Sequence, residues 1–289
     1  MKRREILLAG GSYLLLVSVP SFAQQQSKVW RVGILSPRAR RASIESEPHE
    51  EFRNGMRDLG YVEGKNVQYE WRYADGMYER LPDLAASLVK LKIDVIVAAT
   101  TPAALAAQHA TRVIPVVFVA VSDPLGSGLV ANLAQPGGNI TGISNLMGDT
   151  SQKQLSLLVA VLPKLSRVGV LSNPGNRSNE GAYKSVQTAS KTLGVIVFRV
   201  QARTAAEIAQ AFSAMARERA DACYVIGDSF FFSQREQLAE LAAKARLPAI
   251  YSQRQHVVVG GLMSYGANPG GLYRRAATHV DKILKGARP

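Results

Sequence analysis

The chain has 289 residues, of which 47% are hydrophobic and 20% are charged, a composition that is ordinary for a globular protein. This length allows one large domain or two domains of modest size. The formal net charge is +13, but the basic residues are scattered, so the charge pattern does not indicate a nucleic-acid partner. The single cysteine, Cys223, excludes an internal disulfide bond and lies in an apolar run, where we expect it to be buried.

The first segment has the three parts of a secretory signal peptide. Residues 2–4 are positively charged, an apolar run follows over residues 6–19, and small residues precede a junction after Ala23. The alternative is an uncleaved membrane anchor, but the apolar run is short for a span of about 20 residues. We therefore expect residues 1–23 to be removed during export. Two adjacent arginines leave the export route open between the Sec and twin-arginine pathways.

A short phrase then occurs twice, as RVGILSP at residues 31–37 and as RVGVLSNP at residues 167–174. Both copies are short runs rich in β-branched residues that end in turn formers, as buried parallel strands do. The match continues on both sides, with Gly60 and Gly194 each placed to end a helix in the left-handed conformation. Seven elements recur in the same order, which indicates an internal duplication.

Each half alternates strands with helices. The first half is predicted as strands or helices over residues 29–35, 48–61, 66–73, 78–91, 93–100, 101–111 and 114–123. The second half matches it over residues 166–171, 179–195, 195–201, 204–218, 220–228, 233–246 and 247–253. Alternating strands and helices require a parallel sheet with right-handed crossovers, so each half forms an α/β, doubly wound lobe.

The predicted domain organisation is two facing lobes joined by hinge segments. We expect residues 28–142 to form lobe one and residues 143–265 to form lobe two. The glycine-rich segment 257–266 is predicted to be extended, and residues 266–289 to return to lobe one through an amphipathic helix.

Ligands of open parallel sheets bind beyond the carboxyl ends of the strands, so two facing lobes would enclose a ligand in a cleft. Small polar residues follow those strands in both halves. The candidate ligand-binding residues are Ser36, Thr100, Thr101, Ser122, Asp123, Asn173, Asn176, Asp228, Ser229 and Ser252. Hydroxyl and amide groups both donate and accept hydrogen bonds, and can orient a small ligand.

Roles within this set stay open at the level of sequence. Asp123 or Asp228 would hold a ligand ammonium, and Thr100 with Thr101, at a helix start, would hold a carboxylate. The alternative for every member is that it caps a helix. The arginines that follow the first strand, at positions 38, 40 and 41, are expected in a solvated loop rather than on an anionic ligand.

Three tyrosines are candidates for stacking on a ligand. We expect Tyr78 and Tyr224 to pack in the core instead, whereas Tyr251 lies near a strand end.

Catalytic signals are poor. The four histidines show no metal-ligand spacing, and neither a nucleophile elbow nor a dinucleotide-binding glycine pattern occurs. The sequence therefore predicts a binding protein that is not an enzyme and uses no cofactor or metal.

The chain resembles a family over residues 30–289. The resemblance is carried by RVGIL, FRNGMRDLGYVEGKNV, TPAALAAQHAT, GDSFFFSQRE and GGLMSYG, and most specifically by residues 115–142 and the turn at 61–66. These motifs are similar to the ABC-transporter substrate-binding family that includes TrpX-like tryptophan-binding lipoproteins. The resemblance implies a type I periplasmic binding fold and delivery of an amino acid or another small organic ligand to an ABC permease in the inner membrane.

By position, the resemblance carries over Thr101 with Pro102, Asp123 with Pro124, Asn173 and Asp228 as motif residues. No cysteine lies at the cleavage site, so we expect this chain to be a free periplasmic protein and not a lipoprotein. We also expect it to be monomeric. Members of the family usually continue past the point that corresponds to residue 289, with an extended segment and another helix. This chain is therefore expected to be a fragment or a truncated form. Two alternatives remain: a periplasmic sensing subunit for a chemoreceptor or kinase, and a sugar-responsive regulator, which would need a DNA-binding element where the signal peptide stands.

Overall fold

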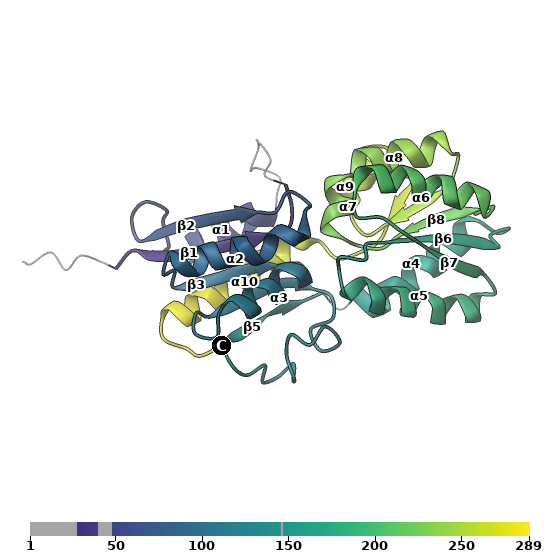
Figure 1. Ribbon diagram of the computed structural model, residues 1–289. Helices are drawn as coiled ribbons and strands as arrows, with labels where there is room; N and C mark the ends of the chain where they lie inside the picture. The colour runs from purple at the N-terminus through teal and green to yellow at the C-terminus, as the bar shows by residue number, and fades with distance from the viewer. Residues whose placement is uncertain (1–27, 40–47, 146) are drawn as a thin grey trace, which may run out of the picture.

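The computed structural model describes residues 28–39, 48–145 and 147–289. The predicted signal peptide at 1–23 and two of the loop arginines, Arg40 and Arg41, lie outside the described residues. Figure 1 shows two α/β lobes that lie side by side, as the duplication predicts.

Lobe one contains nine elements from the first half of the chain and one helix from its end. They are β1 (Trp30–Ser36), α1 (Pro48–Asp58), β2 (Val67–Tyr73), the 3-10 turn η1 (Tyr78–Arg80), α2 (Leu81–Lys90), β3 (Val95–Ala99), α3 (Thr100–Ala110), β4 (Val116–Val121), β5 (Ile140–Ser144) and α10 (Pro269–Leu284).

Lobe two contains the elements between β5 and α10. They are α4 (Met147–Val161), β6 (Arg167–Ser172), α5 (Ser178–Leu193), β7 (Ile196–Gln201), α6 (Ala205–Arg217), β8 (Ala222–Val225), α7 (Ser229–Ser233), α8 (Arg235–Lys244), β9 (Ala249–Tyr251), α9 (Arg254–Val258) and β10 (Met263–Ser264).

The two sheets repeat one topology. Their strand orders are β2-β1-β3-β4-β5 and β7-β6-β8-β9-β10, and every pairing is parallel. Helices cover both faces, with α1 and α10 on one face of the first sheet and α2 and α3 on the other. Because all strands of a lobe run the same way, their carboxyl ends meet at one edge, which the loops before the helices line.

The duplication is visible at the atomic level. Gly33 and Gly169 sit at equivalent points of β1 and β6, and an added Cβ would lie 2.3 Å from Ile93 Cδ1 and 2.7 Å from Met215 Cγ. The side chains that pack on these two strands therefore leave no room for a larger residue unless they shift. The predicted helix stops are also confirmed, since Gly60 and Gly194 have φ angles of 89° and 69°.

The chain crosses between the lobes twice. It leaves lobe one after β5, which pairs with β4 and ends at Ser144, two residues beyond the predicted boundary. It returns through residues 265–268 to α10, which packs on α1 and contacts β4. A hydrogen bond from the Tyr61 hydroxyl to Asp281 Oδ1, of 3.0 Å, fixes α10 to lobe one.

The segment 257–266 differs from its predicted extended form. Residues 254–258 form α9, and only residues 263–264 form a strand. The valines there favour a strand, but the His256 ring stacks on Tyr251 with 4.7 Å between the ring centroids, and Gly260 ends the helical turn with φ at 104°. Tertiary packing thus overrides β-propensity. Within the residues that the structure describes, none of the helices combines the length and apolarity that a bilayer crossing needs.

Candidate functional site

A pocket lies between the strand edges of the two lobes. It is lined by Arg38, Thr100, Thr101, Ala120, Ser122 and Asn145 of lobe one, by Thr150, Asn176, Ser178, Gly227, Asp228, Ser229, Ser252 and Gln253 of lobe two, and by Gly266, Ala267, Pro269, Leu272 and Tyr273 of the returning segment. Its free volume is about 70 Å³. One water needs roughly 10–15 Å³, so this is the space of a few atoms that water or a small solute can fill.

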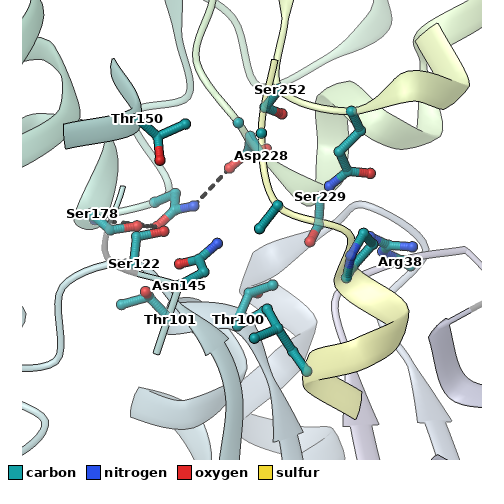
Figure 2. A pocket seen from close by; sticks show the side chains of 18 of the residues that line it. Arg38, Thr100, Thr101, Ser122, Asn145, Thr150, Ser178, Asp228, Ser229 and Ser252 are labelled. Atoms are coloured by element: carbon teal, nitrogen blue, oxygen red, sulfur yellow. Dashed lines mark hydrogen bonds between the residues drawn. The ribbon is translucent and has the colours of Figure 1, made fainter. Parts of the chain in front are cut away.

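The predicted polar residues after the strands largely meet there. Thr100, Thr101, Ser122, Asn176, Asp228, Ser229 and Ser252 all line the pocket. Figure 2 shows the side chains of Thr100, Thr101, Ser122, Asp228, Ser229 and Ser252 converging from both lobes onto one space. This convergence follows from the parallel topology, because each of these residues lies in the loop after a strand or at the start of the helix that follows it.

In lobe one, the start of α3 forms part of the pocket wall. Thr101 is 1% exposed, yet neither its hydroxyl nor that of Thr100 has a hydrogen-bond partner among the described residues. The hydroxyls therefore do not cap the helix, whose start has no side-chain cap. Thr100 and Ala120, which both line the pocket, have φ angles of 66° and 56°, a strained backbone that concentrates at ligand-binding sites.

In lobe two, Asp228 is the centre of a hydrogen-bond network. Its Oδ1 accepts from Asn173 Nδ2 at 3.0 Å and from the backbone N–H of Phe230 at 2.9 Å, and its Oδ2 accepts from Asn176 Nδ2 at 2.8 Å. Burial raises the pKa of Asp228, and these hydrogen bonds oppose that rise. The carboxyl group is thereby held rigidly at the pocket wall, with acceptor capacity left on Oδ2.

Two side chains of lobe one reach across to lobe two. The Tyr78 hydroxyl donates to Asp228 Oδ1 at 2.8 Å and accepts from the N–H of Phe230 at 3.1 Å. The Arg38 guanidinium stacks on Phe232, with its Cζ 4.1 Å from the ring centroid. Both contacts meet α7, so the structure shows the lobes in a closed arrangement.

Three predicted residues do not line the pocket, although each supports the cleft. Ser36 is buried and its Oγ accepts from the N–H of Arg38 at 3.3 Å. Asp123 Oδ1 accepts from the N–H of Gly126 at 2.7 Å within a local turn, so it neither lines the pocket nor caps a helix. Asn173 orients Asp228.

Three further expectations are corrected or completed. Arg38 is 5% exposed and is not in a solvated loop, because α7 covers it. Tyr251 is fully buried under His256 and does not reach the pocket. Tyr78 is part-buried against both lobes but also bonds Asp228. Tyr224 and Cys223 are core residues, as expected.

Several pocket residues escaped the sequence reasoning. They are Arg38, Asn145, Thr150, Ser178, Gln253, Leu272 and Tyr273. Asn145 follows β5 and Ser178 begins α5, so the rule that polar residues after parallel strands face the cleft could have found both. Within the described ranges, no group of three or more histidine, cysteine, aspartate or glutamate side chains has metal-binding proximity.

Comparison with known proteins places this geometry in a family. Residues 45–289 match the family model described as ABC transporter substrate binding protein. A tyrosine-binding protein of Clostridioides difficile is 29% identical over 235 residues, which cover 81% of this chain and 67% of the relative.

Two solved structures are also similar. An ABC domain from Streptococcus pneumoniae in complex with L-Trp is 25% identical, with a TM-score of 0.82 over 91% of this chain and 87% of that one. A ligand-free, open substrate-binding protein from Clostridium difficile is 26% identical, with a TM-score of 0.59 over 90% of this chain and 86% of that one. With two lobes around a shared pocket and a family model that spans most of its length, this chain belongs to the ABC transporter substrate-binding proteins.

Proposed function

We propose that this protein binds an amino acid in the pocket between its lobes and hands it unchanged to the permease of an ABC importer. The family delivers small ligands to such permeases outside the cytoplasm. The proposal extends this to a periplasmic, monomeric receptor that is released by cleavage of residues 1–23 and does no chemistry on its ligand.

The observation that carries the proposal is a set of buried polar atoms that have no partner and line one pocket. Among the described residues these are Arg38 Nη1, the hydroxyls of Thr100 and Thr101, Asn145 Oδ1 and Gln253 Oε1. Buried polar groups are normally hydrogen-bonded, and leaving one unpaired costs about 1–3 kcal/mol. Several such groups in one pocket indicate that a polar ligand completes them.

The chemistry of these groups favours an amino acid. The unpaired set contains a cation, hydroxyls and amide oxygens, so the ligand must offer both acceptors and donors. A carboxylate and an ammonium on adjacent atoms supply both, and Asp228 adds a negative charge for the ammonium. The relatives named for tyrosine and for L-Trp support the same ligand class.

The closed arrangement gives further support. At nearly equal identity and coverage, this chain has a TM-score of 0.82 to the L-Trp complex and 0.59 to the open, ligand-free protein. Lobes that close on a ligand remove it from water and bring both sets of polar groups onto it.

Thermal unfolding with the twenty L-amino acids tests the proposal, together with native mass spectrometry of freshly purified protein. A ligand at 100 times its Kd stabilises the folded state by about 2.7 kcal/mol, which raises Tm by several degrees. Thr101→Val should weaken this shift because it removes a pocket hydroxyl, whereas Thr188→Val, at an exposed site on α5, should leave it unchanged. The proposal is wrong if no amino acid shifts Tm and none co-purifies.

A further inference from the structure

Arg38 is a buried cation without an anionic partner. Its side chain is 5% exposed and follows β1 directly. Within the described part of the chain, its Nη1 has no hydrogen-bond partner and its guanidinium forms no ion pair. Moving a charge out of water costs several kcal/mol unless an opposite charge and hydrogen bonds compensate it.

A second buried arginine shows what compensation looks like in the same neighbourhood. Arg235 is 6% exposed and faces the same Phe232 ring, with its Cζ 5.1 Å from the centroid. Its guanidinium is paired with Glu236 at 2.5 Å. The aromatic ring offsets only part of the cost of burying a cation. Arg38 has this ring contact but lacks, among the described residues, the counter-charge that Arg235 has.

The protein does not supply that charge from within the pocket. The other charged residue of the lining is Asp228, whose oxygens accept from Tyr78, Asn173, Asn176 and the N–H of Phe230, and no ion pair joins it to Arg38 among the described residues. Figure 2 shows Arg38 near Ser229 at one end of the pocket, with Thr150 and Ser178 at the other end. The unpaired Nη1 of Arg38 is therefore left for a ligand that enters the pocket.

We propose that Arg38 binds the carboxylate of the amino acid ligand and makes the pocket select for that anion. This inference rests on the proposed function. A neutral hydroxyl at the start of α3 offers a carboxylate one hydrogen bond, whereas a guanidinium offers an opposite charge and parallel N–H donors that match both carboxylate oxygens. Arg38 therefore outcompetes Thr100 and Thr101 for the carboxylate, and the hydroxyls are left to the other polar groups of the ligand.

The test compares each amino acid with its carboxamide, which keeps the size but removes the negative charge. The L-amino acid that shifts Tm most and its carboxamide are titrated by calorimetry into wild type, Arg38→Gln, Arg38→Lys and the matched control Arg235→Gln. Wild type and the control should prefer the acid by at least tenfold. Arg38→Gln should lose most of that preference by binding the acid at least tenfold more weakly while binding the carboxamide almost unchanged.

Arg38→Lys separates charge from packing. It keeps the positive charge and should therefore keep a preference for the acid, although its single ammonium cannot form the two parallel bonds of a guanidinium. The inference is overturned if Arg38→Gln weakens acid and carboxamide equally, or if its preference for the acid matches that of wild type. If no amino acid binds wild type at all, the proposed function fails, and this inference fails with it.

Discussion

Replacing Tyr78 by phenylalanine should weaken ligand binding without weakening the folded lobes. The substitution removes one hydroxyl, which joins lobe one to Asp228 and Phe230 of lobe two. The hydroxyl is desolvated only when the lobes are closed, and burial beside Asp228 raises the pKa of Tyr78 well above its usual value. Tyr78 therefore acts as a neutral donor at neutral pH.

The magnitude follows from the bonds that are lost. The N–H of Phe230 still has Asp228 Oδ1 at 2.9 Å, so no donor is left unpaired, and the loss is the hydrogen bond to the carboxylate. Such a bond contributes about 1.5–3 kcal/mol. That free energy stabilises the closed form alone, and the apparent Kd rises as the closed population falls. We expect a Kd that is roughly 10- to 150-fold higher.

Calorimetric titration with the amino acid found in the thermal screen measures this effect, and solution X-ray scattering should show a more extended protein at equal ligand concentration. Tyr61→Phe is the matched control, because its hydroxyl also donates to an aspartate, Asp281, but within lobe one. It should lower Tm with and without ligand by the same amount and leave Kd unchanged. A wild-type Kd for Tyr78→Phe, or an equal loss of affinity in Tyr61→Phe, would refute the role of the contact in closure.

Two further predictions concern stability. Burial lowers the pKa of His256 from 6.5 to about 4, so the unfolded chain takes up that proton first as the pH falls, and the free energy of unfolding drops by about 3 kcal/mol between pH 6.5 and 4. His256→Gln should flatten the fall of Tm from pH 7 to pH 5. The control His109→Gln, at an exposed histidine, should not change it. Parallel curves of Tm against pH for wild type and His256→Gln would contradict this prediction. Gly33→Ala and Gly169→Ala should each lower the free energy of unfolding in urea by about 1–3 kcal/mol, because an added Cβ meets a side chain at 2.3 Å and 2.7 Å. Gly271→Ala, which meets nothing within 4 Å in α10, should raise it by up to about 1 kcal/mol, and equal effects at all three glycines would contradict the packing argument.

The fold was predictable because the duplication gives two independent copies of the same evidence. A single strand–helix pattern fits more than one fold. Here two copies carry glycines at matching positions in the strands and at the helix ends, and a parallel sheet in each half accounts for both copies. The parallel topology then places Thr101, Ser122 and Ser252 at the cleft, since carboxyl ends of parallel strands share an edge.

What escaped prediction depends on contacts between distant segments. Arg38 shares its loop with other arginines, so the local sequence suggests solvent, and only the approach of Phe232 from the other lobe buries it. Asp123 and Asn173 follow strands as the pocket residues do, but a local turn and a neighbouring carboxylate occupy their side chains. Neither spacing nor residue type distinguishes these cases.

The double crossing between the lobes also determines how the molecule responds to tension. Lobe two is inserted between β5 and α10, and both ends of the inserted segment are anchored in lobe one. A force applied between Trp30 and Leu284 is therefore borne by the first sheet and the α1–α10 contact, and lobe two is shielded. Only after β5 or α10 detaches does the load pass through lobe two. A pulled molecule should thus yield in a fixed order, lobe one before lobe two, even though the two halves share one design.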